Sequence, residues 1–213
     1  FMKIVEKDFI EINFTGKTAD GELFDSNLKE NLEKIDSKAP VKPFIFGLGQ
    51  GMFLKGIEDF LIGKELGKYE ITLEPKEGFG ERDRSLIRMV PLKVFHEKQV
   101  RPIAGMMFDF DGRPAKILIV SGGRVTVDFN NPLAGKKVVY NIEVIRKVED
   151  LKEKVNAFNE FLFKKEFPME IKEKKLILEV DKQLVQLVPM FKEKYKEIFD
   201  LDLEAKESVL EKK

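Results

Sequence analysis

Residues 44–58 read FIFGLGQGMFLKGIE, and this stretch is the most informative in the chain. It is apolar and aromatic, is interrupted by glycines, and carries almost no charge before its end. Around it the chain is highly charged, with 36% Asp, Glu, Lys and Arg. A surface loop is normally polar, so an apolar loop that leads into a short helix is expected to be buried or to line a pocket. We interpret residues 44–58 as the floor of an apolar cleft that holds peptide.

The composition limits the class of protein. The chain has 213 residues, of which 43% are hydrophobic, and its 38 Lys and Arg balance 38 Asp and Glu. The zero net charge argues against nucleic acid as a partner, and no apolar run is long enough to span a bilayer. We therefore expect a cytoplasmic protein without a membrane partner. Abundant Lys and Glu, with no Cys and no Trp, favour a thermophilic source.

The same counts exclude several kinds of active site. Without cysteine there is no disulfide, thiolate zinc site or cysteine nucleophile. His96 is the single histidine, so a histidine-based metal centre is not expected, and a hydrolase triad would have only one base. We expect no metal site and no cofactor.

Hydrophobic periodicity predicts a mixed α+β protein. Alternating apolar residues predict strands at 9–16, 68–73 and 138–148, with hairpins at 19–22 and around 121–124. Residues 55–61 are expected to form a short helix that ends near Gly63, and the loop at 26–42 is expected to contain about one helical turn. From Leu151 the period becomes helical, followed by a strand at 175–180 and a helix after Pro189.

Several short motifs stand in order over most of the first 150 residues. They are NFTG (13–16), DGELFDS (20–26), FIFG (44–47), FLKGIE (53–58), GFG (78–80) and NPLAGK (131–136). Each motif is weak alone, but the set resembles the FKBP-type peptidyl-prolyl isomerases, in particular their SlyD-like, archaeal long-type branch. The resemblance implies an FKBP-like antiparallel, twisted sheet wrapped on a short helix.

The resemblance also implies a domain organisation. An isomerase domain would comprise residues 1–84 and 133–150, interrupted by a small β-rich chaperone domain at 85–132, inserted in the flap. Residues 151–213 would form an α/β C-terminal domain, which in the long archaeal forms is associated with dimerisation.

The implied pocket is lined by nine residues: Phe14, Phe24, Asp25, Phe44, Phe53, Leu54, Ile57, Phe79 and Tyr140. Ile57 would form the floor under the proline ring, and the backbone N–H of Leu54 would donate to a substrate carbonyl. Asp25 would act at the rim, paired with the Tyr140 hydroxyl. The sequence departs from the family at the floor, which often carries Trp, and at Phe79 and Phe14, where tyrosine is usual. Taken singly, phenylalanines at period two are usually core residues.

The insertion is predicted to be a second site, which holds unfolded chains and passes them to the cleft. Methionine suits surfaces that accept many partners. The candidate residues are Met89, Val90, Pro91, Val94, Phe95, Met106, Met107 and Phe108, although most of them are expected to form the core of the small domain. In the tail, a homodimer interface is predicted at Phe158, Phe161, Phe163 and Phe167.

The function implied by the resemblance is isomerisation of X-Pro bonds in unfolded or proline-containing polypeptides, with chaperone activity. The first alternative is a holdase chaperone with weak or no turnover, which the departures at Ile57 and Phe79 favour. A structural adaptor is a second alternative. Nickel binding by a histidine-rich tail is not expected in a chain with one histidine.

Overall fold

The computed structural model describes residues 3–35, 37 and 41–208. The chain divides into two compact units. The first contains residues 3–16, 23–71 and 140–208, and the second contains residues 17–22 and 72–139. Each unit is described in turn.

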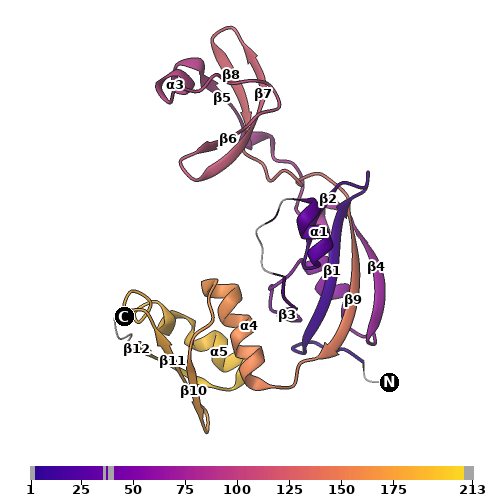
Figure 1. Ribbon diagram of the computed structural model, residues 1–213, viewed down its shortest axis with the longest axis vertical. Coiled ribbons are helices and arrows are strands. Elements are labelled where there is room, and N and C mark those ends of the chain that lie inside the picture. The colour runs from indigo at the N-terminus through magenta and orange to yellow at the C-terminus, as the bar shows by residue number, and fades with distance from the viewer. Residues whose placement is uncertain (1–2, 36, 38–40, 209–213) are drawn as a thin grey trace. The chain divides into compact units, whose positions relative to one another are not determined.

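A five-stranded sheet forms the body of the first unit, and Figure 1 shows its strands β1 and β9 side by side. The strand order is β2-β1-β9-β4, and β3 pairs antiparallel with β1 from Phe9↔Gly47 to Ile12↔Phe44. The strands are β1 (Phe9–Thr18), β2 (Leu23–Ser26), β3 (Phe44–Gly47), β4 (Gly67–Leu73) and β9 (Val138–Lys147).

Two short helices accompany this sheet. Helix α2 (Lys55–Leu61) buries Ile57, Glu58 and Leu61. The chain leaves the helix through Gly63, whose φ of +83° requires glycine. The predicted helix and its end are confirmed. The loop predicted at 26–42 contains the short helix α1 (Lys29–Lys34).

Strand β1 shows why periodicity predicted this sheet correctly. Ile10, Ile12 and Phe14 are buried, whereas Glu11 and Asn13 are partly exposed. A strand turns alternate side chains to opposite faces, so one face of β1 joins the core. The α+β class and the expected strands at β1, β4 and β9 are confirmed.

The C-terminal part of the first unit contains a second sheet, in the order β10-β11-β12. Strands β10 and β11 are antiparallel, whereas β11 and β12 are parallel, so the chain must cross over between them. The sequence patterns did not predict β10 or β12. The elements are α4 (Leu151–Phe163), β10 (Met169–Lys172), β11 (Lys175–Val180), η3 (Val188–Phe191), α5 (Lys192–Phe199) and β12 (Asp202–Glu207).

Aromatic rings fill the core of this C-terminal part. The ring of Phe158 lies 5.2 Å from Tyr195 and 5.7 Å from Phe199, and Phe167 is 4% exposed. The Tyr195 hydroxyl donates a hydrogen bond to Asn159 Oδ1. The prediction that Phe158 and Phe167 form a dimer interface is therefore wrong, because both rings are used within their own chain.

A four-stranded antiparallel sheet in the order β5-β8-β7-β6 forms most of the second unit (Figure 1). The hairpin between β7 and β8 turns at Gly122 and Gly123, both with positive φ, as predicted. One face of the sheet holds a core around Phe95, Ile117 and Val127. The elements are η1 (Pro75–Glu77), η2 (Arg84–Leu86), β5 (Ile87–Pro91), α3 (Leu92–Glu97), β6 (Met107–Phe110), β7 (Arg113–Ser121) and β8 (Arg124–Asp128).

Candidate functional site

Five of the nine predicted pocket residues form one aromatic cluster in the first unit. The ring of Phe53, just before α2, lies 5.3 Å from Phe14 on β1, 5.1 Å from Phe44 on β3 and 5.6 Å from Tyr140 on β9. Phe24 on β2 joins through an edge contact with Tyr140 at 5.7 Å. Such pairs stabilise the arrangement beyond the area that they bury. The structure thus brings together rings from four strands and a loop.

The members of this cluster differ in their access to solvent. Ile57 is fully buried and Tyr140 is 1% exposed, whereas Phe24, Phe44 and Phe53 are partly exposed. A substrate can touch the partly exposed rings directly. Ile57, the predicted floor, is out of its reach because this side chain is fully buried.

Asp25 lies beside this cluster on β2. Partial burial raises the pKa of the Asp25 carboxyl, against a smaller lowering by the Ser26 backbone N–H. Burial also raises the pKa of Tyr140, and the negative charge of Asp25 adds to this rise. The Asp25 charge therefore acts on the Tyr140 hydroxyl, and both groups are partly shielded from water, where a ligand's polar group would interact strongly with Asp25.

The segment after β2 is fastened to β1 by side chains that the sequence analysis missed. The backbone N–H of Phe14 donates to Asn27 Oδ1 at 2.8 Å, and Asn27 Nδ2 donates to the Ile12 carbonyl at 2.9 Å. Ser26 Oγ donates to the Phe14 carbonyl at 2.8 Å. These bonds fix the strand end that carries Asp25. Ser at the end of a strand and Asn directly after it are the sequence signal for such side-chain bonds to the backbone.

Glu58 is a second residue that the sequence analysis missed. Its side chain is 3% exposed on α2 and accepts hydrogen bonds from the backbone N–H groups of Gly49 at 2.8 Å, Gly51 at 3.3 Å and Phe53 at 2.9 Å. A glycine-rich loop has N–H groups that a helix or strand would otherwise satisfy. The carboxylate therefore holds the loop that carries Phe53.

Gly16 on β1 allows the rings to approach the sheet closely. A Cβ atom at this position would lie 2.9 Å from Cε1 of Tyr140 and 3.0 Å from Cζ of Phe24. These separations are shorter than normal contacts, so the two rings occupy space that only glycine leaves open.

A recess of about 860 Å³ borders the cluster. Phe14, Asp25 and Phe44 line it on one side, and residues of α4 line it on another. This volume lies within the range of ligand pockets. Ile57 and Leu54, the predicted floor and backbone donor, are not among its lining residues. Leu54 is the N-cap of α2, in an extended conformation.

Phe79, the remaining predicted pocket residue, belongs to the second unit. It is partly buried in the loop after η1.

The residues predicted as a chaperone surface divide into two groups. Phe95 is fully buried, and Val90, Met106 and Phe108 pack against its cluster, so Phe95 cannot contact a client in the folded domain. Val94 is partly buried. Met89 and Met107 are 66% and 49% exposed, and Pro91 is also exposed. Three further exposed apolar residues were missed: Ile103, Ile119 and Val120.

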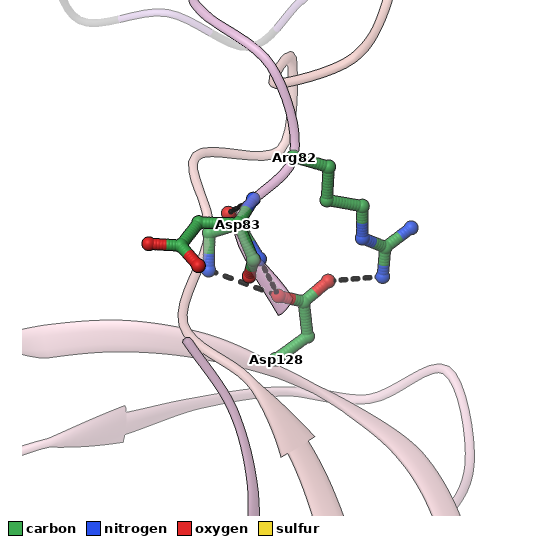
Figure 2. A network of polar contacts seen from close by, with 4 residues as sticks. Arg82, Asp83 and Asp128 are labelled. Atoms are coloured by element: carbon green, nitrogen blue, oxygen red, sulfur yellow. Dashed lines mark hydrogen bonds and ion pairs between the residues drawn. The ribbon is translucent and has the colours of Figure 1, made fainter. Parts of the chain in front are cut away.

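A polar network in the second unit joins the segments on either side of the β5–β8 sheet. Figure 2 shows the Asp128 carboxylate pointing toward the Arg82 guanidinium, with which it forms an ion pair. Asp128 Oδ1 accepts from the N–H of Asn130 at 3.0 Å and from its side-chain amide at 2.7 Å. The N–H of Asp83 donates to Asn130 Oδ1 at 2.9 Å.

This network lowers the pKa of Asp128. Burial by itself would raise it, but the bonds from Asn130 and the Arg82 charge outweigh burial. The network thus ties the incoming chain at 82–83 to the outgoing chain at 128–130. The two pairs of residues in this network are far apart in sequence, so no local sequence pattern predicted that they would interact.

Within the described part of the chain, no helix is long and apolar enough to cross a membrane. The described residues also contain no group of three or more His, Asp or Glu side chains placed to hold a metal ion.

Comparison with known proteins gives two family matches. The model described as FKBP-type peptidyl-prolyl cis-trans isomerase matches residues 2–96, and the model described as FKBP26, IF domain, matches residues 88–133. The short-type peptidyl-prolyl cis-trans isomerase of Methanocaldococcus jannaschii is 32% identical over 145 residues, which cover 66% of this chain and 92% of the relative.

Two bacterial relatives are similar at the same level. The FKBP-type peptidyl-prolyl cis-trans isomerase SlyD of Haemophilus influenzae is 30% identical over 149 residues, covering 68% of this chain and 72% of the relative. The FKBP-type 16 kDa peptidyl-prolyl cis-trans isomerase of Escherichia coli is 32% identical over 139 residues, which cover 63% of this chain and 87% of the relative.

Proposed function

This chain belongs to the FKBP-type peptidyl-prolyl cis-trans isomerases, and we propose that its catalytic cleft is formed by the aromatic cluster around Phe53 together with the recess beside Asp25. The observation that carries this proposal is the meeting of Phe14, Phe44 and Tyr140 around Phe53, with Phe24 packed against Tyr140. These rings come from distant parts of the sequence, and only the fold brings them together.

An apolar cleft suits this reaction. Rotation about an X-Pro bond must break amide resonance, against a barrier of roughly 18–20 kcal/mol. The planar amide is more polar than the twisted one, so removal from water destabilises the ground state more. Removing an amide from its hydrogen-bond partners costs about 1–3 kcal/mol, whereas a thousandfold acceleration requires about 4 kcal/mol. Desolvation must therefore be helped by orientation of the bound chain.

We assign the roles of the cleft residues from the solvent exposure of their side chains. Phe24, Phe44 and Phe53 offer partly exposed ring surface and act as walls around the proline ring. Asp25 interacts with polar groups of the substrate at the rim. Ile57 and Tyr140 are buried and act as the layer that holds the walls in position. Leu54 at the start of α2 supplies a backbone N–H.

We assign residues 85–132 to an inserted chaperone domain. The match of residues 88–133 to the FKBP26 IF domain supports this assignment. Its client surface would consist of Met89, Pro91 and Met107, extended by Ile119. Thr126 on β8 pairs with both Met89 and Ile119, which places these two residues in one row across the sheet. The archaeal long-type organisation, a C-terminal domain at 151–213 that dimerises, and a cytoplasmic location belong to the same proposal.

A holdase with little turnover is the second candidate. The complete burial of Ile57 favours it, because the predicted floor is closed in this state. The two candidate functions differ in the rate of X-Pro isomerisation that they predict. A cleft that works as an isomerase accelerates cis-trans exchange of a short proline peptide, whereas a holdase only suppresses aggregation.

The test is catalysed refolding of a protein whose slow phase is proline isomerisation. We expect the intact chain to accelerate it, and Phe44→Ala to lose about tenfold in kcat/KM, equivalent to about 1.4 kcal/mol. A Met89→Ser, Ile119→Ser double variant should weaken refolding catalysis but leave turnover of a tetrapeptide intact. A wild-type chain that leaves both rates at background would contradict isomerisation by this cleft.

A further inference from the structure

The recess beside the predicted catalytic residues has a second wall that the family match does not explain. Phe14, Asp25 and Phe44 line one side, whereas Ala157 and Phe161 of α4 line the other. Helix α4 lies outside residues 2–96 and 88–133, the parts matched by the family models. The C-terminal segment therefore borders the place where substrate is expected.

Helix α4 is fixed to the sheet by charged side chains. Arg146 on β9 donates to Glu11 at 2.8 Å and to Glu153 on α4 at 3.0 Å. Lys42, just before β3, forms an ion pair with Glu160 on α4. A helix held at two points along its length gives the recess a defined width, rather than a loose flap.

The surface of α4 that faces the recess suits an extended peptide. Ala157 leaves space because it has only a methyl group, and the partly exposed ring of Phe161 supplies apolar contact. About 860 Å³ is more than a proline ring needs. Residues on one side of the proline could therefore lie between α4 and β3.

The charges around the recess favour a cation. Among its described lining residues, the carboxylates Glu11, Asp25, Glu153, Glu160 and Glu166 outnumber the cations Lys42, Arg146 and Lys164. Arg146 pairs with both Glu11 and Glu153, and Lys42 pairs with Glu160, so these five groups together keep one negative charge. Within the part of the chain that the structure describes, neither Asp25 nor Glu166 forms an ion pair, so their charges are available to a ligand.

We propose that α4 is the second wall of the substrate cleft and that the recess binds the residues adjacent to the proline, with a preference for Lys or Arg. This inference rests on the proposed function, because the predicted catalytic residues share the recess. It makes the C-terminal segment a determinant of which prolines are isomerised.

The test uses the full chain and two lengths of one X-Pro peptide, a tetrapeptide and a decapeptide. Ala157→Trp fills the recess and should raise KM for the decapeptide about tenfold more than for the tetrapeptide. Lys152→Trp, at an exposed position of the same helix that does not line the recess, is the matched control. An equal effect of Ala157→Trp on both lengths would overturn the inference.

A second part of the test varies the charge of the peptide and does not depend on how Ala157→Trp folds. Decapeptides with Lys, Ser or Glu beside the proline should differ in kcat/KM, with Lys about fivefold better than Glu. Glu166→Lys, an exposed substitution, should abolish this preference. A wild-type enzyme without preference, or a preference unchanged in Glu166→Lys, would show that the recess does not select basic chains.

The two proposals fail in different ways. If the wild type does not accelerate even the tetrapeptide, the proposed cleft is wrong and the inference about α4 falls with it. If the tetrapeptide is turned over but neither length nor charge matters, the cleft stands and only the role of α4 is removed.

Discussion

The carboxylate of Glu58 accepts a hydrogen bond of 2.9 Å from the backbone N–H of Phe53, the residue at the centre of the aromatic cluster. The same carboxylate binds the N–H groups of Gly49 and Gly51. One buried charge on α2 thus determines the position of the ring that contacts Phe14, Phe44 and Tyr140. The proposed cleft therefore depends on a buried side chain of α2.

Glu58→Gln should destabilise the protein and lower isomerase activity together. A glutamine keeps one acceptor oxygen but turns an N–H donor toward the loop, so we expect a loss of about 2–3 kcal/mol in the free energy of unfolding. Urea denaturation measures this loss. Asp59→Asn, an exposed change on the same helix, is the control and should cost less than about 0.5 kcal/mol. Equal stability of Glu58→Gln and wild type would refute the role of Glu58.

Asp25→Asn should stabilise the fold in a manner that depends on pH. The folded-state pKa of Asp25 is raised by burial above the ordinary value of 3.8. The folded protein therefore keeps this proton at pH values where the unfolded chain has lost it. The stability of wild type relative to the variant should be greatest below the unfolded-state pKa, and should fall as pH rises through the folded-state pKa.

Unfolding of both proteins in urea, at a series of pH values from about 3 to 7, measures this difference. A difference that stays constant across the series, or that grows in favour of wild type as pH rises, would mean that Asp25 is well solvated.

Ile57→Ala and Phe44→Ala should show which of the two side chains stabilises the fold by packing and which contacts substrate. Ile57 is fully buried, so its truncation should cost about 2–5 kcal/mol of stability by leaving a cavity. Phe44 is partly exposed and lines the recess, so its truncation should reduce kcat/KM more than stability. Thermal unfolding and peptide turnover, measured on both variants, distinguish the two effects. The reverse pattern would make Ile57 the substrate-contacting residue.

Arg82→Met should loosen the connection to the β5–β8 sheet. It leaves Asp128 buried without its cation, which we expect to cost about 1–2 kcal/mol of local stability. Hydrogen exchange of β8 amides reports this loss, with Arg84→Met, an exposed arginine, as the control.

Acid should weaken the same connection. Because the pKa of Asp128 is lowered, its contribution is present above the ordinary value of 3.8 and disappears as pH falls through the folded-state pKa. Protection of β8 that does not respond to Arg82→Met or to acid would show that the backbone hydrogen bonds alone hold this connection.

Local chemistry determined much of the fold in advance. Alternation along β1 and β9, the glycines at 122–123 and the stop at Gly63 depend on near neighbours only, so they were predictable. The ordered motifs of the first 150 residues were sufficient to indicate the family. Strands β10 and β12 were missed because β10 has only four residues and β12 is mostly charged, and each acquires its partner only through β11.

The sequence by itself determined the isomerase family, the α+β class and the identity of the rings available for a cleft. Only the tertiary structure decided which apolar residues remain exposed, since Phe95 and Met89 are equally hydrophobic neighbours with opposite burial. It also decided that Glu58 holds the Phe53 loop and that α4 borders the recess. Burial and long-range hydrogen bonds depend on residues that folding brings together, and no local pattern records which residues those are.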